Sequence, residues 1–165
     1  MTYRSNGVLG RDELHGVPSE ERLRRGPVIV IECVENIPCD PCVSACPRGA
    51  ISIEGDVNGT PSVDPETCDG CGVCLSACPG LAIFSIDASG NGDTATVRIP
   101  YEYRPLPEVG EMVTAVDRAG EAVGAARVTR VANSRAMDRT PVVSLEVPRE
   151  RAMDVRHFVM KKRSG

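Results

Sequence analysis

Most of the chain after residue 27 consists of short apolar runs separated by segments rich in Gly, Pro, Asn and Asp. Residues 28–32 form a β-branched run, whereas apolar and polar side chains alternate over residues 94–103. Both patterns are typical of β-strands bounded by tight turns. The pattern predicts strands over residues 28–32, 50–53, 61–64, 81–87, 94–103, 111–117, 121–131 and 141–147.

Helical signals are short and lie near the two ends of the chain. Residues 19–25 predict one helical turn, and residues 148–156 predict a short helix that starts at a proline. The polar residues 1–26 otherwise lack a periodic apolar face. We interpret them as an N-terminal arm that becomes ordered on a partner or on the protein's own surface, with disorder as the alternative.

A change in composition divides the rest of the chain. The polar, glycine-containing segment 89–93 predicts a linker, and every cysteine precedes it. We therefore expect an arm over 1–26, a cysteine-rich domain over 27–93 and a further domain over 94–165. Four or five short strands with tight turns predict that the last domain is a small antiparallel β-barrel, followed by a C-terminal helix and a basic tail at 161–163.

All eight cysteines lie between residues 33 and 78, in two halves of an internal repeat. Residues 68–79 have the spacing C-x2-C-x2-C-x3-C-P, which is the bacterial spacing for iron–sulfur ligation. A shift of 32 residues superposes residues 39–47, which carry the last three positions of the same run. Three closely spaced thiolates wrap one cubane cluster, and the fourth points to the other cluster.

The repeat predicts which thiols share a cluster. Because the fourth cysteine of each half ligates the other half's cluster, Cys46 joins the second set and Cys78 joins the first. Repeat symmetry places the missing ligand at Asn36, and Cys33 is left to replace it through a widened loop. The predicted ligands are Cys33, Cys39, Cys42 and Cys78 for cluster one, and Cys46, Cys68, Cys71 and Cys74 for cluster two.

Three alternatives to this assignment stay open. If Cys33 is a buried structural thiol, cluster one would have three irons, carry a non-cysteine ligand or be absent. Two zinc sites are the second alternative, although zinc usually takes two separated C-x2-C pairs. Disulfides are the third, but they need an oxidising compartment, and the N-terminus lacks the apolar core of a secretory signal.

The net charge of −4 is distributed unevenly. Residues 28–93 hold ten Asp or Glu against one Arg, which gives −9, whereas residues 94–165 hold thirteen Lys or Arg against nine Asp or Glu, which gives +4. An acidic cysteine-rich domain favours basic surfaces of redox partners and disfavours nucleic acid. No apolar run approaches the ~20 residues of a membrane span, so we expect a soluble, cytoplasmic protein.

The sequence contains no nucleophile–base constellation, phosphate-binding loop, or flavin or nicotinamide motif, and no catalytic residue is predicted. We expect the chain to move single electrons and to leave turnover to a partner. Five apolar residues near the cysteines are expected to cover the clusters or to pack in the core: Ile37, Ile51, Val73, Ile83 and Phe84.

Residues 28–88 resemble the two-cluster 4Fe–4S ferredoxin family. The layout over 24–155 also resembles the small iron–sulfur subunit of multi-subunit FAD-dependent dehydrogenases that act on proline, hydroxyproline or sarcosine-type amines, most strongly at residues 32–39 (ECVENIPC). This resemblance implies that Cys33 is a ligand, that FAD lies on flavoprotein partner subunits, and that the chain belongs to a hetero-oligomer. It also implies that electrons pass from the substrate-reduced flavin through two 4Fe–4S clusters to an acceptor.

Two other functions fit the same residues. One is a free-standing ferredoxin whose C-terminal barrel recognises several reductases, and the other is a structural or regulatory iron–sulfur scaffold without electron flux. The barrel and the charged termini favour the subunit, because a small ferredoxin alone needs no such docking surface. The expected fold class is α+β, with a ferredoxin-like two-cluster domain followed by a small antiparallel β-barrel.

Overall fold

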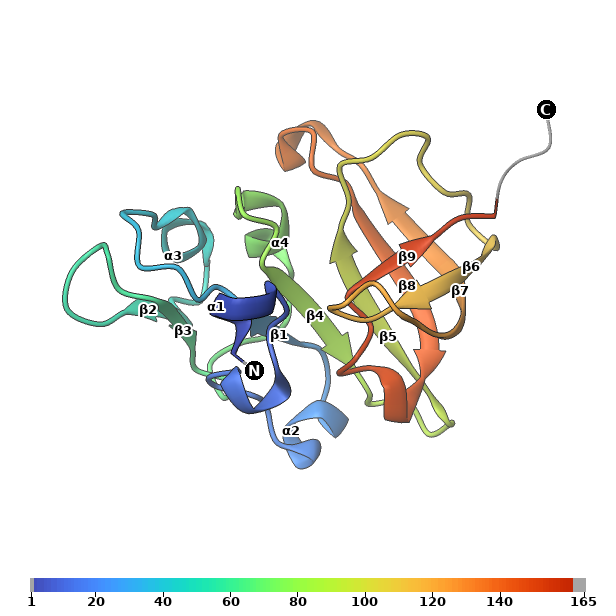
Figure 1. Cartoon of the computed structure of the whole chain (residues 1–165), viewed down its shortest axis with the longest axis horizontal. Coiled ribbons are helices and arrows are strands. Elements are labelled where there is room, and N and C mark those ends of the chain that lie inside the picture. The colour runs from blue at the N-terminus through green and yellow to red at the C-terminus, as the bar shows by residue number, and fades with distance from the viewer. Residues whose placement is uncertain (1, 162–165) are drawn as a thin grey trace.

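The computed structural model describes residues 2–161 and contains one large antiparallel sheet. Its seven strands follow the order β1-β4-β5-β8-β7-β6-β9. Figure 1 shows the cysteine-rich part, coloured blue to green, beside the C-terminal strands, coloured yellow to red. The strands of this sheet are β1 (Val28–Ile31), β4 (Ile83–Asp87), β5 (Thr94–Pro100), β6 (Met112–Val116), β7 (Ala122–Ala132), β8 (Val142–Pro148) and β9 (His157–Val159).

The predicted strands are all present, including β2 (Ile51–Ile53) and β3 (Pro61–Val63), which form a separate two-stranded ribbon. Strand β9 was not predicted, because three residues are too few to show an alternating pattern. The helix predicted over 148–156 is wrong beyond its first turn. Only the 3-10 turn η3 (Arg149–Arg151) forms there, and the chain then continues into β9, which pairs with β6.

The C-terminal strands do not close into the predicted barrel. Strand β5 pairs with β8 along one edge and with β4 along the other. Closure would require β9 to pair with β5, but no such pairing forms among the described strands: β4 pairs with Thr96–Arg98 on that edge, and β1 and β9 stand at opposite ends of the strand order. The barrel is therefore not confirmed within residues 2–161. The described strands form an open sheet that runs from the cysteine-rich part into the C-terminal part through the β4–β5 hairpin.

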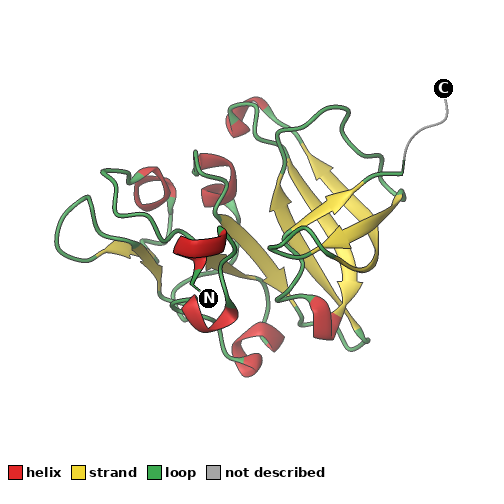
Figure 2. Ribbon diagram, viewed as in Figure 1, coloured by secondary structure: helices red, strands yellow, loops and turns green. Residues whose placement is uncertain are grey.

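The helices are short and lie around the sheet (Figure 2). Helices α3 (Pro41–Ala45) and α4 (Val73–Ala77) lie within the two cysteine motifs and contact each other. No helix within residues 2–161 is long and apolar enough to cross a membrane. The other helical segments are α1 (Tyr3–Asn6), η1 (Arg11–Glu13), α2 (Glu20–Arg24) and η2 (Arg135–Met137).

The N-terminal segment lies on the protein's own surface. Ser19 begins α2 by accepting a hydrogen bond from the Arg22 N–H (3.1 Å). The carbonyl of Leu23 accepts a hydrogen bond from the Ala88 N–H (3.1 Å), which ties α2 to the end of β4. Of the basic tail, Lys162 and Arg163 lie outside the described residues.

Two hydrophobic cores stabilise the molecule. The larger core contains the buried faces of the C-terminal strands, with Val97 on β5 and Leu145 on β8 fully buried. The second core surrounds the cysteine motifs and contains Ile29, Leu75 and three of the cysteines. All four residues of β1 are buried, which agrees with its unbroken β-branched run.

Candidate metal centre

The sequence repeat is also a repeat of backbone structure. Helices α3 and α4 each end at the cysteine that precedes a proline: Cys46 and Cys78 are C-cap residues with φ/ψ of −78°/108° and −77°/112°. The Ala50 N–H donates to Cys46 Sγ (3.3 Å), and the Ala82 N–H donates to Cys78 Sγ (3.4 Å). The two halves therefore present these sulfur atoms in the same way.

Cys74 shows which thiols gather at the second motif. Burial, followed by the neighbouring thiols Cys68, Cys71 and Cys46, raises the pKa of Cys74 to about 12. The same four cysteines line one small pocket together with Ile29. The structure thus brings together the four residues of the predicted second set, including Cys46 from the first half of the repeat.

Cys33, the cysteine that stands outside the repeat, lies among the first set. Burial raises the pKa of its thiol, and the nearby Cys78 and Cys39 raise it further. Burial also raises the pKa of Cys42, with additional contributions from Cys78 and Cys33. These four thiols therefore share one neighbourhood, which Cys78 reaches from the second half of the repeat.

The widened loop after Cys33 is held by hydrogen bonds to other segments. Asn36, at the position that repeat symmetry assigns to a ligand, is exposed, and its side-chain Nδ2 donates to the Asn58 carbonyl (3.2 Å). The Cys39 N–H donates to the carbonyl of Val57 (3.4 Å) in the connection between β2 and β3. Asn36 therefore holds the loop by this hydrogen bond, and Cys33 lies with the other thiols of the first set.

The loop of the second motif requires glycine. Gly70 and Gly72 have φ of +66° and +85°, and a Cβ on Gly70 would lie 2.4 Å from the backbone of Pro27. The Gly70 N–H donates to Cys68 Sγ (3.3 Å). Sets of four soft thiolates that receive backbone N–H donors suit an iron–sulfur cluster. The residues present therefore fit two such clusters.

The thiols themselves are free in the structure. None of the eight cysteines forms a disulfide. Within residues 2–161, no three His, Cys, Asp or Glu side chains form a group that could hold one metal ion. The raised pKa of Cys33, Cys42 and Cys74 means that their protons must be displaced when a metal binds, because thiolates are the ligands.

Two of the five apolar residues expected to cover the clusters lie at the surface. Ile37 and Val73 are 51% and 49% exposed, whereas Ile51, Ile83 and Phe84 are buried. The prediction of core packing is therefore wrong for Ile37 and Val73, whereas a role in covering a cluster stays a prediction for both. These two side chains instead present apolar surface beside the two thiol sets.

Two arginines that the sequence analysis missed hold the loop 68–71. The buried Arg22 donates from Nη2 to the Cys68 carbonyl (2.6 Å). The partly buried Arg98 donates from Nη1 to the Cys71 carbonyl (3.2 Å) and from Nη2 to the Gly70 carbonyl. Burial lowers the pKa of Arg98. No spacing in the sequence marks these contacts, because their acceptors are backbone carbonyls far along the chain.

Glu32, the residue before Cys33, binds two further arginines. Its Oε1 accepts from Arg118 Nη2 (2.5 Å) and from Arg156 Nε (2.6 Å), and the three side chains are 4–10% exposed. Burial lowers the pKa of Arg156 to about 10. Its Nη2 is buried without a hydrogen-bond partner in the described part of the chain. This buried ionic group ties the start of the first motif to the C-terminal strands.

Residues 32–82 match the family model of the 4Fe-4S dicluster domain. The chain is 42% identical over 74 residues to an uncharacterized ferredoxin of Methanocaldococcus jannaschii, covering 44% of this chain and 43% of the relative. It is 38% identical over 55 residues to a pyruvate synthase subunit of the same organism, covering 33% and 58%. It is 30% identical over 106 residues to the beta subunit of a dissimilatory-type sulfite reductase of Archaeoglobus fulgidus, covering 64% and 26%.

No solved structure matches the chain. The chain spans less than two thirds of the length of each of these three relatives. The matched segment 32–82 contains all eight cysteines. This part of the chain is therefore a 4Fe–4S region of ferredoxin type.

Proposed function

We propose that this chain is an electron-transfer subunit of a flavin-dependent amino acid or amine dehydrogenase. In this proposal, single electrons pass from reduced FAD on partner subunits through two 4Fe–4S clusters to an acceptor. The observation that supports this proposal most directly is that each half of the repeat contributes one cysteine to the set of the other half. Two sets of four thiols result.

The proposed ligands follow these two neighbourhoods. Backbone N–H groups that donate to Cys46, Cys68 and Cys78 support the assignment, because such donors stabilise thiolates bound to iron. The clusters supply the one-electron chemistry, and the chain holds and shields them. Cluster one is assigned to Cys33, Cys39, Cys42 and Cys78, and cluster two to Cys46, Cys68, Cys71 and Cys74.

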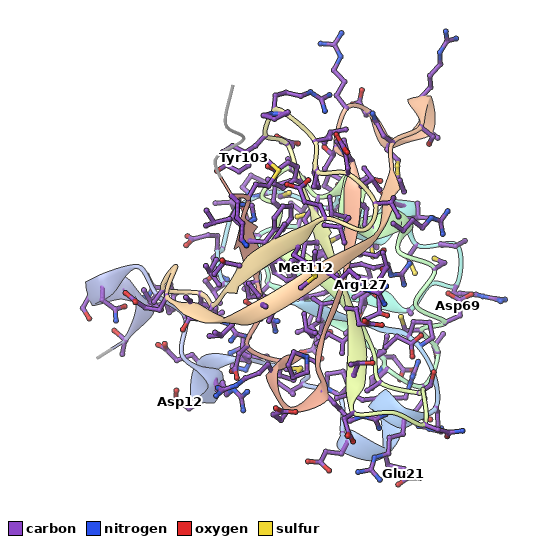
Figure 3. The ribbon with its side chains drawn as sticks, turned by 90° about the vertical axis from the view of Figure 1, so that its right-hand side faces the viewer. Asp12, Glu21, Asp69, Tyr103, Met112 and Arg127 are labelled. Carbon is purple, nitrogen blue, oxygen red and sulfur yellow. The ribbon has the colours of Figure 1, made fainter. Side chains whose placement is uncertain are left out.

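The C-terminal strands are proposed to dock on the flavoprotein. Large apolar side chains are exposed there: Tyr103 is 63% exposed, Met112 47% and Val159 56%. The centroid of the Tyr103 ring lies 5.5 Å from that of His157, which is on the same short strand β9 as Val159. Figure 3 shows Tyr103 and Met112 on the side of the molecule formed by the C-terminal strands. Exposed apolar residues on one side of a molecule favour a protein interface there.

Two relatives are named as subunits of larger oxidoreductases, which supports a hetero-oligomer. The flavoprotein partner is supported by the resemblance at residues 32–39. The test is purification of the native complex at high salt, followed by anaerobic addition of proline, hydroxyproline or sarcosine. We expect a stoichiometric FAD protein and loss of the visible cluster absorbance when the substrate amine is added.

Other outcomes would favour the other functions. An isolated, cluster-containing monomer would support a free-standing ferredoxin, and clusters that no flavoprotein reduces would support a scaffold. The docking surface is tested by Met112→Glu, which is expected to release the flavoprotein. The matched control is Val17→Glu, at an apolar residue that is 44% exposed in the N-terminal segment, and it is expected to leave the complex intact.

A further inference from the structure

The two thiol sets have different charged surroundings. A 4Fe–4S cluster gains one negative charge with each electron, so nearby fixed charges set how readily it is reduced. The loop of the second set contacts Arg22 and Arg98. At Cys33 in the first set, the Glu35 backbone N–H favours the thiolate, and the Glu35 carboxylate opposes it. This difference in charge gives the two sets different electrostatic environments.

Arg98 packs directly against the second motif. Besides the carbonyls of Gly70 and Cys71, its guanidinium donates to Ser85 Oγ (2.7 Å). A Cβ on Gly72 would lie 2.9 Å from Arg98 Nη1, so the guanidinium fills the space beside this loop. Among the described residues no carboxylate lies within ion-pair distance of Arg98, and Asp87 acts on it only from farther away.

Arg22, on helix α2, contributes a second positive charge. It is 7% exposed, and it donates to the carbonyls of Pro65 (2.5 Å), Gly26 (3.1 Å) and Cys68 (2.6 Å). All hydrogen-bond acceptors of its guanidinium within residues 2–161 are carbonyl oxygens, so its charge is not neutralised by a bound carboxylate. Arg22 and Arg98 together place two cations beside the loop 68–71, whose own carboxylate, Asp69, is paired with Arg48 (2.7 Å).

The arginines that contact the start of the first motif are arranged differently. Arg118 and Arg156 share the carboxylate of Glu32, which offsets one of their two charges. Burial of Cys68 and Cys74 opposes reduction at the second set, since the added charge loses water. The same low-dielectric surroundings strengthen the attraction of the two cations for that charge. Cys42 in the first set is buried as well, so burial acts on both sets, whereas the two cations, unpaired within residues 2–161, act on the second.

We infer that Arg98 and Arg22 raise the redox potential of the cluster held by Cys46, Cys68, Cys71 and Cys74 above that of the other cluster. An electron that enters at the first set therefore moves on to the second, and no bond of the chain forms or breaks. Reduced flavin on the partner supplies the electron, and the final acceptor removes it. This inference rests on the proposed function. Both arginines are positioning residues, since they act through the loop and its charge.

The test is an anaerobic redox titration of the full chain, monitored by electron paramagnetic resonance. We expect two separate potentials. Arg98→Gln is expected to lower the higher potential and to leave the lower one unchanged, whereas Arg98→Lys, which keeps the charge, restores most of the shift. Glu35→Gln is expected to raise the lower potential by a smaller amount that fades at high salt, because Glu35 is exposed.

The matched control is Arg127→Gln, which removes an exposed arginine paired with Glu146 on the C-terminal strands (Figure 3) and is expected to move neither potential. A single shared potential, a shift of the lower potential in Arg98→Gln, or equal shifts in Arg98→Gln and Arg127→Gln would overturn the inference. If Arg98→Gln fails to retain its clusters, Glu35→Gln serves as the test. A rise of the lower potential in this variant supports the assignment of the lower potential to the first set, and a rise of the higher potential overturns it. A chain without iron–sulfur signals would instead refute the proposed function itself.

Discussion

The two halves of the cysteine repeat share their motif and local backbone but not their surroundings. Cys46 and Cys78 end their helices with nearly the same φ and ψ angles. In contrast, the side chains of Arg22 and Arg98 hold the loop of the second half, whereas the Asn36 amide and the Cys39 N–H hold the widened loop of the first half. The motif therefore fixes how each thiol is presented, and distant segments determine how firmly each loop is held.

The repeat also imposes a backbone conformation that one of its residues does not favour. Gly49 and Leu81 occupy equivalent positions, and their φ angles are +61° and +52°. For a leucine this left-handed conformation costs about 1–2 kcal/mol, whereas a glycine adopts it freely. The chain after each C-cap cysteine thus follows the same path regardless of the side chain.

The largest expected effect separates the motif region from the C-terminal strands. Anaerobic removal of iron is expected to reduce amide protection by about 100-fold or more around α3, α4 and the β2–β3 ribbon, because metal binding there is coupled to folding. Protection in β5, β7 and β8 is expected to persist, because the larger core contains no cysteine. Hydrogen exchange measured by mass spectrometry checks this, and equal loss in both regions would contradict it.

A second prediction concerns the link between the first motif and the C-terminal strands. Glu32→Gln leaves Arg118 and Arg156 buried without a carboxylate, which is expected to cost about 3–5 kcal/mol of unfolding free energy. Glu146→Gln, which breaks the exposed pair with Arg127, is expected to cost less than about 1 kcal/mol. Anaerobic urea unfolding of the cluster-loaded chain measures both. Similar small losses would show that the buried ionic group does not join the two parts.

The third prediction compares two glycines with similar backbone angles. Gly70→Ala combines a positive φ with a contact against Pro27, so we expect a loss of about 2–4 kcal/mol. Gly49→Ala has nothing within 4 Å of the new Cβ, and we expect a loss of about 1–2 kcal/mol from the backbone alone. The same urea experiment measures the difference. Equal losses would mean that the close approach to Pro27 does not constrain the second loop.

The sequence predicted those features that depend on local spacing. β-branched runs and alternation located the strands from β1 to β8, and the 32-residue repeat identified both thiol sets, with Cys33 in the first of them. These signals are local, because the alternation of a strand and the cysteine spacing of a cluster loop each extend over only a few residues. The ligand roles of the eight cysteines stay a prediction until metal is measured.

The features that the sequence did not predict depend on contacts between distant segments. Arg22 lies in a polar arm and Arg98 on an alternating strand, and neither position indicates that its guanidinium binds the carbonyls of residues 68–71. The open sheet was missed for a similar reason. Pairing of β4 with β5 across the segment 89–93, which was expected to be a linker, occupies the edge that barrel closure needs.

The most direct test counts iron and acid-labile sulfide per chain in the anaerobically purified parent protein and in Cys33→Ser. We expect about eight of each in the parent, four for each cluster, and a loss of one to four irons in Cys33→Ser with the second set intact. Zinc in place of iron, or an iron count that Cys33→Ser leaves unchanged, would contradict the assignment of two thiolate-held clusters.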